Sequence, residues 1–366
     1  MKRLRLTLLG YFFLFALWGN AADIYVSPTG SDLNDGSKDK PLATVNMALR
    51  KAREMRRLND APTTTIRIIV SGGIYRLKEP IFIRPEDSGL SGHTTIIMAA
   101  PGEEPVFSGG IQITGWKKLL TAVPGLSLKA RNNVWVADLK SVSSQPLEFR
   151  QLWINNVKAV RAKDANGDQM NRILSWDKKE QTCWIPTPTI PGFASIKGAE
   201  FFIHQWWAIA ILRINKMEVK GDSTKLFFEQ PESRIQSEHP WPAPWISKET
   251  GNSPFYLSNA LTFLDEPGEW WLDKLTQKLY YWPRKNEQLN SAEVIAPVLE
   301  NLLQIQGTAE HPVRNVFIVG LRFQHTGWLR PSQQGHVPHQ NGLFMTDAYR
   351  LNPPGTKEKP GLDNQA

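Results

Sequence analysis

The fold is decided by residues 66–110, which read IRIIVSGGIYRLKEPIFIRPEDSGLSGHTTIIMAAPGEEPVFSGG. Short runs rich in Ile, Val, Phe and Tyr are separated here by turns that contain Gly, Pro, Ser and Asp. Because no helical periodicity lies between the runs, the pattern predicts consecutive short β-strands and an all-β architecture. A sandwich, a barrel and a solenoid would each fit this stretch taken alone.

An amphipathic helix is expected ahead of these strands. After Pro41, apolar residues recur at intervals of three and four, and basic residues mostly take the other positions. The apolar positions are Leu42, Val45, Ala48, Leu49, Ala52 and Met55. A solenoid has an open first coil that needs a cover, and a helix at this place supplies it. The helix therefore favours a solenoid.

Residues 113–295 have a different composition. Pro-rich stretches such as HPWPAPW at residues 239–245 interrupt strand-like runs. Most of the 14 Trp of the chain lie in this part, namely Trp116, Trp135, Trp153, Trp176, Trp184, Trp206, Trp207, Trp241, Trp245, Trp270, Trp271 and Trp282. We interpret it as a β domain inserted into the first. The predicted organisation is a capping helix and first coils in residues 22–112, the insertion in residues 113–295, and a return to the coils in residues 296–366.

The N-terminus has the three-part pattern of a secretory signal peptide, MKRLRLTLLGYFFLFALWGNA at residues 1–21. Cations come first, an apolar run from Leu6 to Trp18 follows, and small residues close the segment. The run is shorter than the ~20 residues that a membrane-spanning helix needs. We therefore expect an exported protein, secreted or periplasmic, with no membrane span after signal removal. Loss of Lys2, Arg3 and Arg5 would lower the formal net charge from +8 to +5.

Composition excludes several classes of protein. Hydrophobic residues make up 41% and charged residues 21% of the sequence, which is typical of a folded chain. Cys183 is the only cysteine, so an intrachain disulfide is excluded, and its apolar neighbours favour a buried side chain. The His residues are scattered without metal-ligand spacing, and we expect no metal and no cofactor. Lys and Arg do not cluster with aromatic residues, which argues against a nucleic-acid partner.

Three groups of segments resemble known proteins. The start of secreted right-handed parallel β-helix proteins is similar to IYVSPTGSDLNDGSKDKPLATVNMALRKAR, with SGGIYRL, PEDSG and APGEEPVFSGG. The inserted module of glycoside hydrolase family 141 resembles FRQLWINNVKAVRA, HQWWAIAILRI and FLDEPGEWWLDKLTQKLYYWPR. The return of that family into the helix resembles VLENLLQIQGT, PVRNVFIVGLRFQHTGW and KPGLDNQA. PGEWWLD and FQHTGW, in that order, are the most specific segments.

The resemblance implies a pectin-lyase-like right-handed parallel β-helix, in an enzyme of plant cell-wall polysaccharide degradation. It implies α-L-fucosidase or xylanase activity and an oligo- or polysaccharide partner. Similar proteins continue beyond the final NQA with further coils, and their proposed catalytic acids lie there. We therefore expect a truncated product or fragment that ends at Ala366 before those acids, which leaves the activity of this chain alone open.

Glycoside hydrolysis needs two carboxyl groups, and no spacing in the sequence identifies the pair. The candidates are Glu86, Asp87, Asp265, Glu266, Glu269, Asp273, Asp347 and Asp363. The segment PEDSG around Asp87 is typical of a turn in which Asp accepts backbone hydrogen bonds. Alternation in residues 269–273 favours a structural tryptophan strand over a sugar platform.

His325 is the first candidate for substrate binding. It shares the alternation of Leu321 and Phe323, which we expect to face the interior together with Phe317 and Val319. Because Gly327 predicts a turn next to it, two interpretations stay open. One is a histidine satisfied within the turn, and the other is a cleft residue that binds or polarises substrate.

Two further segments supply candidates for substrate binding. His204, Trp206 and Trp207 combine polar and indole groups that suit a sugar site, although the apolar run after them is typical of a core. The other candidates for substrate binding are Asp363, Asn364 and Gln365, because these residues would enter the next coil in a longer relative.

Three functions are therefore compared. The first is a glycoside hydrolase, and the second is a noncatalytic carbohydrate-binding protein that uses the tryptophans of the insertion. The third is a polysaccharide lyase of the same fold, which would need basic residues and a Ca²⁺-binding Asp cluster on neighbouring coils. The sequence shows no such cluster.

Overall fold

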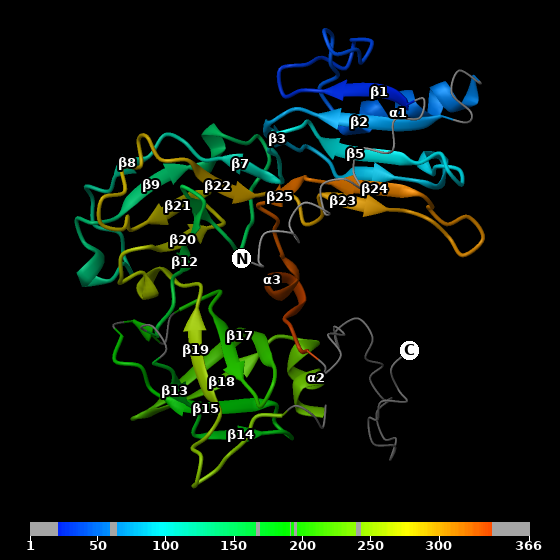
Figure 1. Cartoon of the computed structure of the whole chain (residues 1–366). Coiled ribbons are helices and arrows are strands. Elements are labelled where there is room, and N and C mark those ends of the chain that lie inside the picture. The colour runs from blue at the N-terminus through cyan, green and yellow to red at the C-terminus, as the bar shows by residue number, and fades with distance from the viewer. Residues whose placement is uncertain are drawn as a thin grey trace, which may run out of the picture. The chain divides into compact units, whose positions relative to one another are not determined.

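The computed structural model is mostly β and describes residues 21–58, 64–165, 169–190, 192–193, 196–238 and 243–338 (Figure 1). The chain folds into two compact units. It passes from one unit to the other after residues 111, 298 and 326. We call the described residues 21–111 and 299–326 the coil unit, and the described residues 112–298 and 327–338 the insertion unit. The predicted signal peptide, apart from Ala21, lies outside the described residues. No helix within the described ranges is long and apolar enough to cross a membrane.

The strands of the coil unit stack in three parallel sheets. Their orders are β1-β2-β5-β24, β3-β6-β25 and β4-β23, and the first stack is visible in Figure 1. The bounds are β1 Ala21–Val26, β2 Thr65–Val70, β3 Gly73–Arg76, β4 Ile81–Ile83, β5 Thr95–Ala99, β6 Pro105–Ser108, β23 Leu303–Ile305, β24 Val316–Val319 and β25 Arg322–Gln324.

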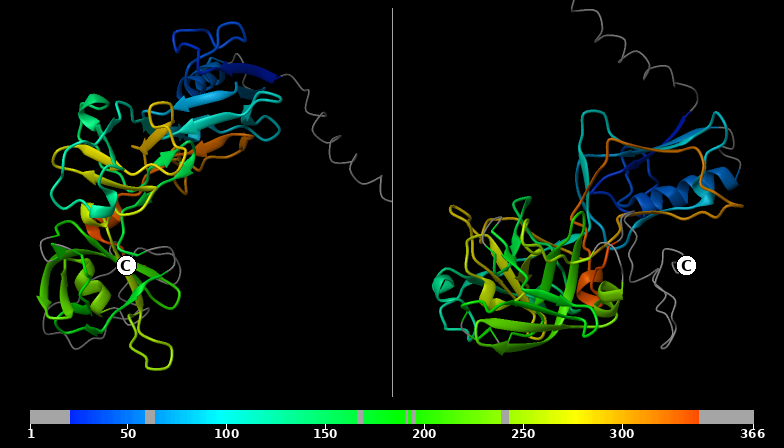
Figure 2. Two further views of the ribbon diagram at one scale, coloured as in Figure 1. Left: turned by 90° about the vertical axis from the view of Figure 1, so that its left-hand side faces the viewer. Right: turned by 90° about the horizontal axis from the view of Figure 1, so that it is seen from below.

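Equivalent apolar residues lie one above another in these stacks. Ile68 pairs with Ile97, and Ile97 pairs with Ile318 in the next coil. The ribbon follows the closed outline of a coil in the right-hand view of Figure 2. Parallel strands connected in this way form a parallel β-helix, so the predicted fold is confirmed in this respect, and the right hand of the coil stays a prediction.

The helix α1 (Val45–Arg57) is the predicted amphipathic helix. It begins after Thr44, whose Oγ1 accepts a hydrogen bond of 3.1 Å from the backbone N of Met47. This bond satisfies one of the N–H groups that a first helical turn leaves unpaired. The buried stripe consists of Val45, Ala48, Leu49 and Ala52, which belong to the same apolar cluster as residues of β1 and β2. The predicted packing of the helix on the first coil is confirmed.

The insertion interrupts the coil between β6 and β23. Within the coil unit, the backbone N of Leu299 donates to the carbonyl oxygen of Gly109 at 3.0 Å, so the two ends of the interruption are adjacent. A side chain at position 109 would force its neighbours to shift, because a Cβ would lie 2.4 Å from Cδ2 of Leu302. Within the insertion unit, the backbone N of Ile113 donates to the oxygen of Val294 at 2.8 Å. The insertion therefore begins and ends at adjacent points, and the strand β7 (Gly110–Gln112) spans its first boundary.

The last described coil corrects one prediction. Phe317 and Val319 were expected to face the interior, and this is wrong. The register of β24 places Ile318 opposite Ile97, which is buried. Because side chains alternate along a strand, Phe317 and Val319 face outward, and they are 52% and 48% exposed.

The alternation changes phase between β24 and β25. Gly320 has a φ of +71°, which a residue with a side chain rarely adopts, and the chain turns there. Phe323 then faces the interior, because it lies opposite Phe107 and stacks on it with ring centroids 5.6 Å apart. Leu321 packs against the same core. The prediction was therefore correct for these two residues, and the turn explains why it failed for the strand before.

The insertion unit consists mainly of antiparallel sheets. The largest has the order β13-β19-β16-β17-β18-β15-β14, a second has the order β12-β20-β21-β9-β8, and β11, β10 and β22 are neighbours in a third. The bounds are β8 Lys117–Lys118, β9 Trp135–Asp138, β10 Trp153–Ile154, β11 Val157–Lys158, β12 Val160–Arg161, β13 Asn171–Arg172, β14 Ser175–Asp177, β15 Thr182–Pro186, β16 Glu200–His204, β17 Ile209–Lys220, β18 Ser223–Phe228, β19 Pro254–Ser258, β20 Glu269–Asp273, β21 Lys278–Tyr281 and β22 Val294–Pro297, with the helices α2 Glu232–Glu238 and α3 Arg330–Gln334.

The core of the insertion unit contains two side chains that the sequence placed there. Trp270 is fully buried and packs on Phe149, with ring centroids 5.2 Å apart. The interpretation of residues 269–273 as a structural tryptophan strand is thereby confirmed. Cys183 is buried as predicted, and burial raises the pKa of its thiol, which keeps the thiol protonated.

Candidate functional site

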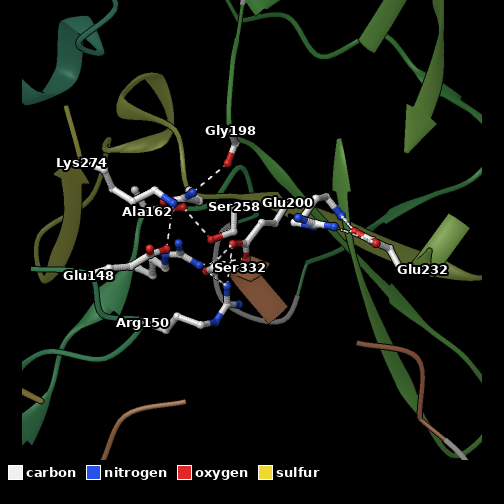
Figure 3. Close-up of polar contacts among 12 residues, drawn as sticks. Glu148, Arg150, Ala162, Gly198, Glu200, Glu232, Ser258, Lys274 and Ser332 are labelled. Atoms are coloured by element: carbon white, nitrogen blue, oxygen red, sulfur yellow. Dashed lines mark hydrogen bonds and ion pairs between the residues drawn. The ribbon is translucent and has the colours of Figure 1, made fainter. Parts of the chain in front are cut away.

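A carboxylate held by two arginines lies inside the insertion unit (Figure 3). Arg150 Nη1 donates to Glu200 Oε1 at 2.5 Å, and Arg161 Nη1 donates to Glu200 Oε2 at 2.8 Å. The three side chains are almost completely buried. Ser332 follows the last described coil in the sequence, and its Oγ accepts a bond of 2.7 Å from Arg150 Nη1. The four residues join segments of the chain that are far apart in sequence.

The charge balance of this ion cluster indicates a structural role. Burial acts to raise the pKa of Glu200, but Arg161 and Arg150 outweigh it and hold the pKa below its ordinary value. A catalytic acid needs a proton to donate near neutral pH, and this carboxyl has none. The cluster has no signal in the sequence, because no local pattern connects its members.

One face of β16 carries aromatic and polar side chains. Core residues alternate in this strand with Glu200, Phe202 and His204, which share the opposite face. The ring of Tyr256 in β19 stacks on Phe202 with centroids 4.6 Å apart, and its centroid lies 6.1 Å from that of His204. Lys163 Nζ lies 5.6 Å from the Tyr256 centroid, close enough for a cation–π contact. Burial lowers the pKa of His204, so its imidazole is neutral near pH 7.

The strand β16 ends in a hairpin with two tryptophans at its tip. The backbone N of Gln205 donates to the oxygen of Ala208 at 2.8 Å, which leaves Trp206 and Trp207 as the turn residues. Their side chains are 57% and 46% exposed. Trp206 stacks on Trp245, with ring centroids 4.9 Å apart and 25° between the ring planes. A sugar site and a core were the two interpretations of this segment. The two tryptophans at the tip are exposed, whereas residues 210–212 behind them are buried.

Asp87 holds a turn, as the composition of its segment predicted. It closes a 3-10 turn over Pro85–Asp87, and its Oδ2 accepts a hydrogen bond of 2.8 Å from the backbone N of Arg84. Arg53 Nη1 lies 3.4 Å from the same carboxylate oxygen. Burial raises the pKa of Asp87 against these contacts. The carboxyl therefore supports the turn between two strands of the coil.

Glu269 also holds backbone groups. Its Oε2 accepts hydrogen bonds from the backbone N of Asp265 (3.0 Å) and of Glu266 (3.2 Å), and its Oε1 accepts one from the backbone N of Lys163 (3.3 Å). Burial raises its pKa to about 7, although the backbone bonds favour the ionised form. Asp273 Oδ1 accepts a bond of 3.0 Å from the backbone N of Leu275 in the next turn. The carboxyls of Glu269 and Asp273 therefore shape loops.

His325 directly follows β25, the last described strand of the coil unit. Its backbone is left-handed with a φ of +60°, and the residue is 9% exposed. Ser108 Oγ lies 2.9 Å from its Nδ1, so the ring is fixed beside the previous coil. This geometry agrees with a histidine satisfied in a turn, and a role in substrate binding stays a prediction.

The remaining candidates, Asp347, Asp363, Asn364 and Gln365, lie outside the described residues. Within the described part of the chain, no group of three or more His, Cys, Asp or Glu side chains could hold a metal ion.

Comparison with known proteins finds a matching family model and a similar solved structure. Residues 132–284 match the family model of the GH141 insertion domain, and they lie within the insertion unit. A solved structure named glycoside hydrolase is 45% identical, with a TM-score of 0.82 over 91% of this chain and 55% of that chain. This chain is a family 141-like protein. The family 141-like chain thus spans about half the length of that glycoside hydrolase.

A curated relative matches part of this chain. The pectate lyase PEL9 of Emericella nidulans is 27% identical over 164 residues, which are 44% of this chain and 34% of that protein. The family 141-like chain is therefore similar to a glycoside hydrolase along most of its length and to a pectate lyase over part of it.

Proposed function

We propose that this family 141-like protein belongs to a glycoside hydrolase that acts on plant cell-wall polysaccharide, of the α-L-fucosidase or xylanase type. The observation that carries the proposal is the 45% identity to a glycoside hydrolase over 91% of the chain. The pectate lyase relative supports a polysaccharide as the substrate class. A stack of coils presents an extended face, which suits a long chain better than a small molecule.

The proposal places both catalytic carboxyls outside the described residues. Glu200 is an ionised partner of two arginines, and Asp87, Glu269 and Asp273 hold turns. These contacts occupy the groups that a hydrolase would use as acid and as nucleophile or base. The resemblance found in the sequence implies the same placement.

Product analysis tests the activity. The chain, and the product of any reading frame that continues past the codon of Ala366, would be incubated with fucosylated xyloglucan oligosaccharides and with xylan. Release of fucose or of xylo-oligosaccharides supports one type or the other. An unsaturated uronic product from pectate would replace the hydrolase with a lyase. Binding without release from either protein would leave a noncatalytic carbohydrate-binding protein.

We also propose that the protein is exported, on the pattern of residues 1–21. N-terminal analysis of the protein recovered from the periplasm or the medium tests this. A full-length N-terminus in the cytoplasm alone would contradict it.

A further inference from the structure

We infer that Trp206, Trp207 and Trp245 form a binding site for the sugar rings of a polysaccharide chain. We call these three residues the tryptophan platform. The site lies within the insertion unit and needs no catalytic group, so the inference stands independently of hydrolysis by the coil unit.

The position of the first two indoles in a turn is the first argument. Two-residue hairpin turns usually contain Gly, Asn or Asp, because these residues adopt the turn backbone at low cost and are polar. Trp206 and Trp207 occupy such a turn and leave about half of each indole exposed. Exposed aromatic patches mark binding surfaces.

The platform is also held rigidly. Trp245 Nε1 donates to the oxygen of Gly251 at 2.8 Å, and the backbone N of Trp245 donates to Ser253 Oγ at 3.0 Å. Trp206 stacks on this anchored indole. A ligand therefore meets a preformed flat apolar surface and does not have to order it, which lowers the entropic cost of binding.

A polar group beside the platform indicates what the ligand carries. His204 lies two residues before Trp206, on the outer face of β16. Its Nε2 is buried and has no hydrogen-bond partner among the described residues. A polar atom left in this way costs free energy, which a ligand hydroxyl recovers when the His204 ring turns to expose the nitrogen. A sugar ring offers both the flat C–H face that stacks on an indole and the hydroxyls at its rim, whereas an acyl chain offers only apolar surface.

Affinity electrophoresis of the full chain tests the inference, with soluble xylan and fucosylated xyloglucan in the gel. Both polysaccharides are used because the platform defines the sugar ring and not its linkage. We expect at least one of them to retard the chain, and Trp206→Ala or Trp245→Ala to weaken that binding at least tenfold. Trp206→Phe keeps a flat ring and should retain part of the binding.

The matched control is Trp184→Ala. Trp184 is a half-buried indole of β15 in the same unit, with Lys220 and Lys225 over its ring. Its loss should leave retardation unchanged. Because the Trp206 side chain is mostly exposed, Trp206→Ala should also keep the thermal unfolding midpoint, so reduced binding would not reflect misfolding.

Other outcomes would overturn the inference. In the gels, these are equal retardation of the wild type and Trp206→Ala, or no retardation of either protein. Outside the gels, they are binding to phosphatidylglycerol vesicles instead of polysaccharide, or formation of a dimer, where either depends on Trp206. Trp206-dependent retardation without sugar release, by this chain and by any longer product of its reading frame, would remove only the hydrolase proposal. Sugar release with Trp206-independent retardation would remove only the platform.

Discussion

The two units of the chain bury their interiors in different ways. In the coil unit, each apolar residue is covered by its equivalent in the next coil, so Phe107 is 1% exposed whereas Phe323, in the last described coil, is 39% exposed. In the insertion unit, sheets close over a core of their own, and specific polar partners such as Glu200 and its arginines are buried in it. A stack is stabilised by repetition, and a closed unit by particular contacts. The two should therefore respond differently to substitution.

The largest effect is expected in the insertion unit, for Glu200→Gln. Loss of the carboxylate leaves Arg150 and Arg161 buried without their counter-charge, which should cost about 4 kcal/mol of unfolding free energy. Hydrogen exchange in urea, followed in peptides of each unit, measures the loss and assigns it to one unit.

Glu148→Gln is the control for this effect. Glu148 pairs with Lys274 at 2.8 Å where both side chains are partly exposed, and its loss should cost less than about 1 kcal/mol. Equal effects of the two substitutions would show that burial does not distinguish the pairs.

In the coil unit, Phe107→Ala should cost about 3 kcal/mol, because it leaves a cavity between Tyr75 and Phe323. Phe323→Ala should cost about 1 kcal/mol, since part of that ring already contacts solvent. Urea unfolding followed in peptides of the coil unit compares them. A cost for Phe323→Ala as large as for Phe107→Ala would mean that the last described coil is covered as well as the inner ones.

A smaller effect should depend on pH and be confined to the insertion unit. The pKa of Glu269 is raised to about 7 from 4.5, so the folded state binds the proton more tightly than the unfolded state. Its contribution to stability is present in full below about pH 4.5 and is lost as the pH rises through about 7. Relative to Glu269→Gln, the wild type should lose about 2 kcal/mol over this range, measured by urea unfolding at each pH. A difference between the two proteins that is constant with pH would contradict the raised pKa.

The smallest effect is expected at the helix that covers the first coil. Thr44→Ala removes the side-chain cap of α1 and should cost about 1 kcal/mol, measured as faster hydrogen exchange in its first turn. Thr44→Ser keeps the hydroxyl and should behave as the wild type. A similar change for Ser and Ala would assign the effect to the methyl group.

Local patterns in the sequence predicted the capping helix and the short strands of the coil. The stripe from Val45 to Ala52 gave the helix, and the short runs with glycine and proline turns gave the coil. The orientation of Phe317 was missed because a single turn at Gly320 changes the alternation, and turn geometry is weakly encoded in composition.

The candidate site was less predictable. Trp206 and Trp207 were recognised from residue type, but their exposure depends on the hairpin, and Trp245, on which Trp206 stacks, comes from a distant loop. The pairing of Arg150 with Glu200 has no sequence signal, because it arises from the packing of distant segments.

The adjacent ends of the insertion bear on how the coil assembles. Ile81 pairs with Leu303 across the whole insertion, and closing a flexible loop of that length would slow formation of the coil. Once the insertion has folded and brought Ile113 next to Val294, the distance left to close is only that between neighbouring strands. The insertion then acts on folding kinetics as a short turn, and we expect the insertion to fold first and β23 to pair with β4 afterwards.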